Sequence, residues 1–237
     1  MKSLHDKQFP NDSKEYRKAR NELLEAEMAL RIQIENVAKM RRSLPLGGKV
    51  KEDYVFMDLA GEKRKLSELF EDGKDTLLLY SMMFDPSGDV PCQMCNSLVD
   101  GLTGNAHHIT QKVNLAVIGK APIEKIRTYA KQAGWDGIQL LSSFENTYNV
   151  DYFGEIDGEQ QPIMNVFVKK EGAIYHTWGS ELCFAIPETG QDPRAMDSIW
   201  PLYNIFDLTP EGRENYYPDI PHNDNKSSCN CGNCDCK

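Results

Sequence analysis

The sequence has 237 residues, 40% of them hydrophobic and 27% charged, and a formal net charge of −9. This length and composition are typical of a soluble globular protein with one large domain and appendages. The negative charge argues against nucleic acid or an anionic membrane as the main partner. The first residues lack the apolar stretch of a signal peptide, and the longest apolar run, Thr76–Phe84, is too short to cross a bilayer. We therefore expect a cytoplasmic protein.

The first predicted element is one long helix over Ser13–Ser43. Asp12 or Ser13 can cap its start, and Pro45 with the following glycines ends it. Some 30 residues at 1.5 Å each make a helix of about 45 Å, longer than a compact domain is wide. Apolar residues recur along it every seven positions, at Tyr16, Leu23, Leu30 and Val37. Two explanations stay open: the helix clamps its own domain, or it pairs with a second copy in a homodimer.

A βαβ pattern follows. Short apolar runs predict strands at Tyr54–Asp58, Thr76–Phe84, Val113–Gly119 and Gln139–Ser143. Helical spacing predicts one helix that opens at Cys92 and a second that opens at Pro122 and has Gly134 at its C-cap. Strands that alternate with helices at this spacing indicate a parallel sheet.

The next segment predicts an antiparallel hairpin beside the parallel strands. Its first strand follows Pro162, its turn is Glu171-Gly172, and its second strand is Ala173–Trp178. A last helix is predicted over Pro193–Phe206, although Pro201 would kink or end it. We divide the chain into an N-terminal helix (1–48), an α/β domain (49–216), and a linker with a cysteine-rich tail (217–237).

The pair Cys92 and Cys95 follows the buried strand and a turn rich in Pro, Gly and Asp. At i and i+3 on the first turn of a helix, two thiols lie on one face and are close enough to bridge. The free N–H groups of the helix favour a thiolate at Cys92, which makes it the nucleophile, with Cys95 as the resolving thiol. Half of a zinc site and two inert buried thiols are the alternatives.

Other side chains have two interpretations each. Asp85 and Asp89, in the loop before the pair, either tune the thiol pKa and accept a proton or only shape the turn. His107 and His108 come at the far end of the helix and are expected to be surface or capping residues. Cys183 is either a buried thiol or a second redox partner.

The last nine residues contain four cysteines, Cys229, Cys231, Cys234 and Cys236. Thiolates at this CxCxxCxC spacing suit Cu(I) or Zn(II), so the tail is a candidate metal site. The alternative is a tail that is oxidised at random. Together with the CxxC pair, the tail leaves open a second function, the binding or handling of a soft metal.

The order of these elements resembles the thioredoxin fold. More specifically, blocks such as KEDYVFMDLAGEKRKLSELFEDGKDTLLLYSMMF, VPCQMCNSLVDGLTGNAHHI and YHTWGS are similar to the thioredoxin-like family catalogued as domain of unknown function 899. Members of that family are described as dithiol–disulfide oxidoreductases. This chain departs from the frequent Gly-Cys-Pro-Ser-Cys version of the pair, because Pro91 precedes Cys92 and Gln93-Met94 separate the thiols.

The resemblance implies an α/β fold with a central mixed sheet. It also implies that the protein is a thiol–disulfide oxidoreductase, that its substrate is a protein or small-molecule thiol or disulfide, and that the redox pair requires no cofactor. It also implies that Pro162 faces the redox pair through a cis peptide bond. His176, on the hairpin, would then modulate Cys92 or serve only as a satisfied sheet histidine. The related peroxiredoxin signature, PxxxTxxC, is not met, because position 89 is Asp.

Overall fold

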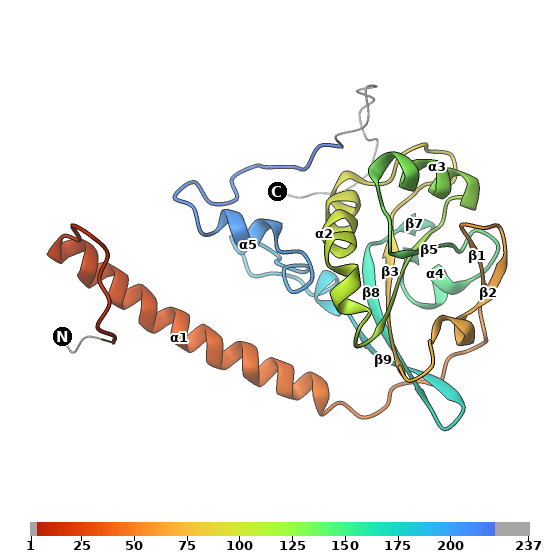
Figure 1. The fold of residues 1–237 in the computed structure, drawn as a ribbon, viewed down its shortest axis with the longest axis horizontal. Coiled ribbons are helices and arrows are strands. Elements are labelled where there is room, and N and C mark those ends of the chain that lie inside the picture. The colour runs from red at the N-terminus through yellow and green to blue at the C-terminus, as the bar shows by residue number, and fades with distance from the viewer. Residues whose placement is uncertain (1–3, 221–237) are drawn as a thin grey trace. The chain divides into compact units, whose positions relative to one another are not determined.

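The computed structural model describes residues 4–220 (Figure 1). The chain divides after Pro45 into two compact units, and each is described here by itself. The first unit is built on a single helix, and the second contains a seven-stranded sheet.

The long helix α1 spans Lys14–Arg42, as predicted. Ser13 is its N-cap, and the Ser13 hydroxyl accepts a hydrogen bond from the Tyr16 N–H at 3.0 Å. No residue of α1 is buried, and its heptad residues Leu23 and Leu30 are each more than half exposed. The homodimer stays a prediction. Among residues 4–220, no helix is long and apolar enough to cross a membrane.

The sheet of the second unit has the strand order β2-β1-β5-β4-β3-β8-β9. Its strands are β1 (Val55–Asp58), β2 (Lys63–Lys65), β3 (Thr76–Met82), β4 (Asn114–Gly119), β5 (Gln139–Ser142), β8 (Ile163–Lys170) and β9 (Ala173–Gly179). The three central strands β3, β4 and β5 are parallel, and β8 and β9 form the antiparallel hairpin beside β3. This is the mixed, thioredoxin-like arrangement that the sequence predicts.

The helices are α2 (Gln93–Ile109), α3 (Ile123–Ala133), α4 (Tyr148–Asp151) and α5 (Leu202–Phe206), with 3-10 turns at Leu66–Leu69 and Glu181–Cys183. Gly134 ends α3 in the left-handed region at φ 70°, where glycine pays no steric penalty. The predicted last helix over Pro193–Phe206 is wrong up to Pro201, and only Leu202–Phe206 is helical. Pro201 is the N-cap of α5, because proline has no N–H to donate within a helix.

The polar stretch Glu145–Gln161 contains regular structure that the sequence does not predict. They are α4 and a small ladder of β6 (Glu155–Ile156) with β7 (Glu159–Gln160). The stretch lacks the periodic apolar pattern on which such predictions depend.

Alternation along β3 produces two apolar cores, one on each face of the sheet. Tyr80 and Met82 pack with α2 and α3, whereas Leu77 and Leu79 pack with the 3-10 turn at Leu66–Leu69 and with α4 on the opposite face. Figure 1 shows the sheet between α2 on one side and α4 on the other. Because α2 follows β3 directly, the first core carries the CxxC pair at the carboxyl end of the central strand.

Candidate active site

Cys92 lies at the start of α2, where it is the N-cap residue. Its backbone N–H donates to the Met83 carbonyl at 2.9 Å, and its own carbonyl accepts from the Asn96 N–H at 2.8 Å. These bonds fix the thiol at the positive end of the 17-residue helix. The side chain is 7% exposed, against 1% for Cys95, so the predicted order of exposure is right although both residues are buried.

Cys95 lies one turn further along and receives two hydrogen bonds from β3 and the loop after it. The Tyr80 hydroxyl donates to Cys95 Sγ at 3.3 Å, and the Met83 N–H donates to the same sulfur at 3.4 Å. Tyr80 is itself 1% exposed. The inner thiol is therefore held by a side-chain donor and a backbone donor.

The two thiols have pKa values that diverge. A hydrogen bond from the Cys95 thiol lowers the pKa of Cys92 the most, and the N–H groups of Cys95 and Met94 and the Tyr217 hydroxyl lower it further. Burial acts in the opposite direction, and the net result is a Cys92 pKa of about 6. The same hydrogen bond, with burial and the nearby Cys92 charge, raises the pKa of Cys95 well above its ordinary value. Near neutral pH, Cys92 is thus the thiolate and Cys95 the thiol.

A buried polar network anchors α2 below the pair. The Tyr129 hydroxyl donates to Asn96 Oδ1 at 2.6 Å, and Asn96 Nδ2 donates to Asp100 Oδ2 at 2.9 Å. The Trp135 indole N–H donates to the other Asp100 oxygen at 2.6 Å. Two acceptors of α2, on Asn96 and Asp100, are thereby tied to α3 and to the residue that follows it closely, Trp135.

The loop before Cys92 is held by α3. Lys125 Nζ donates to the Gly88 carbonyl at 2.8 Å and lies 3.4 Å from an Asp89 oxygen. The Asp85 carboxylate accepts hydrogen bonds from Ser87, which lower its pKa. Asp85 therefore shapes the turn. Pro91 is buried directly before Cys92.

The C-terminal segment covers the pair. The Tyr217 hydroxyl lies 3.9 Å from Cys92 Sγ, and Ile220 is 5% exposed within the same apolar cluster as Cys92. Further back, the Trp200 indole N–H donates to Ser97 Oγ on α2 at 3.2 Å. The sequence predicts a linker from residue 217 on and gives no sign of the contact between Tyr217 and Cys92, because no local pattern connects residues 125 positions apart.

Pro162 precedes β8, whose first residue, Ile163, pairs with Ser81 near the carboxyl end of β3. This puts Pro162 at the edge of the sheet from which α2 starts. The expected cis peptide bond is wrong, since residues 4–220 contain no cis peptide bond. Met164, two residues later, packs in the same core as the two cysteines.

The histidines lie away from the pair. His176 Nε2 is 2.8 Å from Asn165 Oδ1, and its ring packs on Tyr152 and Phe167, in the core on the opposite face of the sheet. Burial lowers its pKa. His107 and His108 are exposed in the last turn of α2, as expected.

Cys183 is partly buried in the turn after β9. Its sulfur lies 3.5 Å from Met196 Sδ and 3.8 Å from Ser180 Oγ, and burial raises its pKa. Within residues 4–220, no group of three histidine, cysteine or acidic side chains is placed to hold a metal ion. The predicted tail ligands Cys229, Cys231, Cys234 and Cys236 lie outside the described residues.

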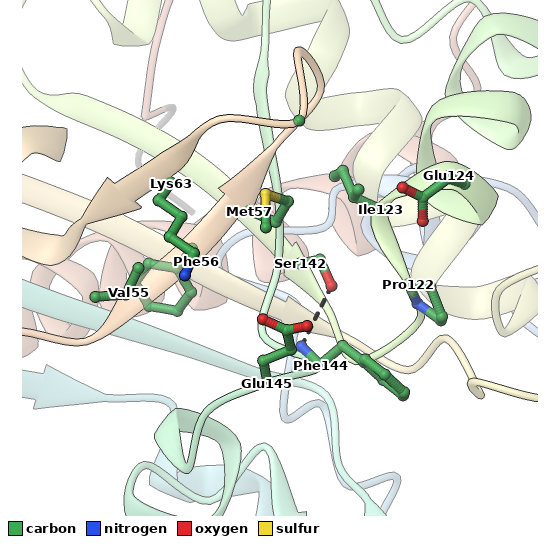
Figure 2. A pocket seen from close by; sticks show the side chains of 11 residues that line it. Val55, Phe56, Met57, Lys63, Pro122, Ile123, Glu124, Ser142, Phe144 and Glu145 are labelled. Carbon is green, nitrogen blue, oxygen red and sulfur yellow. Dashed lines mark hydrogen bonds between the residues drawn. The ribbon is translucent and has the colours of Figure 1, made fainter.

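A cavity of about 280 Å³ lies between β1, the start of α3 and the end of β5 (Figure 2). Met57, Ile123 and Phe144 line it together with the carboxylates of Glu124 and Glu145. The Phe144 N–H donates to Ser142 Oγ at 3.2 Å across its floor. Neither cysteine of the pair lines this cavity.

The chain belongs to the family described as "Bacterial protein of unknown function (DUF899)", which matches residues 6–230. The sequence resemblance is thereby confirmed. No curated protein matches the sequence significantly.

Solved structures with a similar fold include two proteins of the peroxiredoxin class. Peroxidoxin BcpB from Mycobacterium tuberculosis is 17% identical with a TM-score of 0.42, over 67% of this chain and 95% of that one. A mutant of PrxQ from Xylella fastidiosa is 14% identical with a TM-score of 0.40, and the match covers 68% of this chain and 97% of the PrxQ chain. An uncharacterized conserved protein from Geobacillus kaustophilus is 12% identical with a TM-score of 0.42, over 63% and 75%.

Proposed function

We propose that this protein is a thiol–disulfide oxidoreductase in which Cys92 attacks and Cys95 resolves. The observation that carries the proposal is the pair itself. Two thiols lie one turn apart at the start of α2, and a hydrogen bond from Cys95 helps to lower the pKa of Cys92 to about 6. An ordinary cysteine, with a pKa of about 8.5, is only about 3% ionised at pH 7.

The reaction has two steps. The Cys92 thiolate attacks one sulfur of a substrate disulfide, forms a mixed disulfide and expels the other sulfur as a thiolate. Cys95 then attacks Cys92 Sγ, releases the second substrate thiolate and closes the Cys92–Cys95 disulfide, and its proton passes to a departing thiolate. The substrate is reduced by two electrons and the pair is oxidised by two.

The surroundings of Cys95 suit the second step. Its raised pKa depends largely on the Cys92 thiolate, and that charge disappears when the mixed disulfide forms. The donors on Cys95 Sγ, the Tyr80 hydroxyl and the Met83 N–H, then favour the Cys95 thiolate. Because Cys92 is 7% exposed beside Tyr217, the substrate must displace the covering segment before it reacts.

The test uses metal-free, reduced protein in which all four tail cysteines are replaced by serine. At pH 6.5 it is mixed with an aromatic disulfide that releases a coloured thiolate. We expect a fast phase of two thiolates per chain. Cys95→Ser should release one, and Cys92→Ser none. A slow reaction that Cys92→Ser leaves unchanged would overturn the proposal.

Hydrogen peroxide is the matched alternative oxidant. Since Asp89 stands where the peroxiredoxin signature has threonine, we expect peroxide to oxidise Cys92 no faster than an ordinary thiolate. A peroxide reaction faster than the disulfide reaction, and lost in Cys92→Ser, would instead identify a peroxidase.

A further inference from the structure

The segment that covers Cys92 is extended and packs by alternate side chains. Residues 216–220 belong to no helix or strand. Pro218 and Ile220 are buried, and Ile220 lies in the apolar cluster that includes Cys92. Tyr217, 46% exposed, places its hydroxyl 3.9 Å from Cys92 Sγ. A burial period of two residues is what an extended polypeptide shows when it lies along a surface. We call residues 213–220 the strap.

Side chains hold the strap over the pair, and no strand pairing does. Within the described chain, neither sheet includes a residue of the strap. The Ile220 N–H donates to the carboxylate of its neighbour Asp219 at 2.8 Å, and the Tyr203 hydroxyl donates to the Tyr216 carbonyl at 3.1 Å. A segment outside the sheet ladder can leave the surface without unfolding the domain, because few backbone hydrogen bonds must break.

The first residue of the strap is fixed. The Arg213 guanidinium contacts the carboxylates of Asp192, Asp197 and Asp207 and lies 5.1 Å from the centre of the Tyr203 ring. The Arg213 side chain is only 10% exposed. When the strap opens, it therefore stays tethered four residues from the position that contacts Cys92. A segment tethered this closely competes for its place at an effective concentration on the order of millimolar.

We propose that the strap is an internal competitor that occupies the place of the substrate, and that the substrate is an extended polypeptide with aliphatic or proline side chains beside its disulfide. The inference rests on the proposed oxidoreductase function and adds its substrate class. Such a polypeptide replaces the apolar contacts that Pro218 and Ile220 lose when the strap leaves. A small disulfide replaces none of them, so it reacts only with the fraction of molecules in which the strap is open.

The first experiment tests the substrate class, with the full-length, reduced protein whose four tail cysteines are serine. The substrate is a synthetic peptide of residues 214–220 with Tyr217→Cys, joined through that cysteine to an aromatic thiol whose thiolate is coloured. The matched control peptide also carries Pro218→Ser and Ile220→Ser. Each rate is divided by the rate of the same peptide with glutathione. At pH 6.5 we expect the apolar peptide to release thiolate at least several-fold faster than the control peptide, in a reaction that is lost in Cys92→Ser.

The second experiment tests the cover itself. The protein carrying Pro218→Ser with Ile220→Ser is alkylated with iodoacetamide at pH 8.5, and modified Cys92 is measured by mass spectrometry. Because the pKa of Cys92 is about 6, the thiol is ionised at this pH and the rate reports access. We expect alkylation at least several-fold faster than in the natural protein. Leu208→Ser is the matched control, since Leu208 is 84% exposed and covers nothing. Urea unfolding curves show whether each variant is folded.

The possible failures are distinguishable. Equal corrected rates for the two peptides, each with a full equivalent of thiolate, would refute the polypeptide substrate but keep Cys92 as a nucleophile. A small aromatic disulfide that reacts faster than the apolar peptide after the same correction would identify a small-molecule substrate. Unchanged alkylation of the folded double variant would refute the strap as a competitor. Release no faster than in Cys92→Ser would refute the oxidoreductase itself. If the double variant does not fold, the peptide comparison decides, because it uses the natural strap.

Discussion

Individual residues decide which of the two thiols reacts. Helix position alone favours a thiolate at Cys92, and the hydrogen bond from Cys95 adds to the effect. The backbone donors at Cys95 and Met94 are fixed by the helix start, so they are predictable from the CxxC spacing. The Tyr80 hydroxyl and Tyr217 are not, since each reaches the pair from elsewhere in the chain.

The first prediction concerns the pH dependence of Cys92. Its lowered pKa makes the thiolate the main form above about pH 6, and reactivity is lost as the pH falls through that value. The rate of iodoacetamide alkylation should therefore reach half its plateau near pH 6. In Cys95→Ala, which removes the S–H donor, the midpoint should move up. A midpoint near 8.5 in the natural protein would contradict the assigned electrostatics.

The second prediction concerns Tyr80. Tyr80→Phe removes a donor to Cys95 Sγ and should slow the release of the second thiolate several-fold while leaving the first release unchanged. Tyr54→Phe is the matched control, because Tyr54 is equally buried but bonds to Asp151 in the opposite core. Equal effects of the two substitutions on the second step would show that only packing is involved.

Among the elements, α2 determines the geometry of the site. Its apolar face, including Leu98 and Val99, packs on β3, and its polar residues Asn96 and Asp100 bind Tyr129 and Trp135. The sequence indicates the apolar face through its helical spacing. It does not indicate that Asn96 is buried or that Asp100 binds Trp135, because the partners come from α3 and the turn after it.

The third prediction tests this anchor. Tyr129→Phe leaves Asn96 Oδ1 without its donor in a buried site, which should lower the free energy of unfolding by about 1–3 kcal/mol. Tyr16→Phe on α1 is the control, since Tyr16 is 50% exposed and should change stability little. Both changes are measured by urea denaturation. A loss of stability equal to that of the control would show that the network contributes little to holding α2.

For the whole molecule, the division after Pro45 separates a helix with no buried residue from the unit that holds the pair. The fourth prediction follows. A chain that starts at Leu46 should fold cooperatively, and its Cys92 alkylation midpoint should remain near pH 6. Circular dichroism and the alkylation profile provide the measurements. A fragment that fails to unfold cooperatively would show that the second unit depends on α1.

Most of the fold was predictable from the sequence, for a physical reason. Buried strands and amphipathic helices each leave a local pattern, and the caps at Ser13 and Gly134 mark element ends within a few residues. One error came where no such pattern exists, in the polar stretch that forms α4 with β6 and β7. The other came at Pro193–Phe206, where a helical apolar pattern continues across Pro201 but the helix begins only after it.

The strand–loop–CxxC–helix order is written in local sequence patterns, and it puts Cys92 at a helix start. What surrounds the two sulfurs depends on tertiary packing: the Tyr80 and Met83 donors, the trans bond before Pro162, and the cover formed by Tyr217 and Ile220. The reason is the separation along the chain between the residues that interact. Helix and strand patterns repeat over a few residues, whereas the cover joins positions 125 residues apart, and packing alone brings them together.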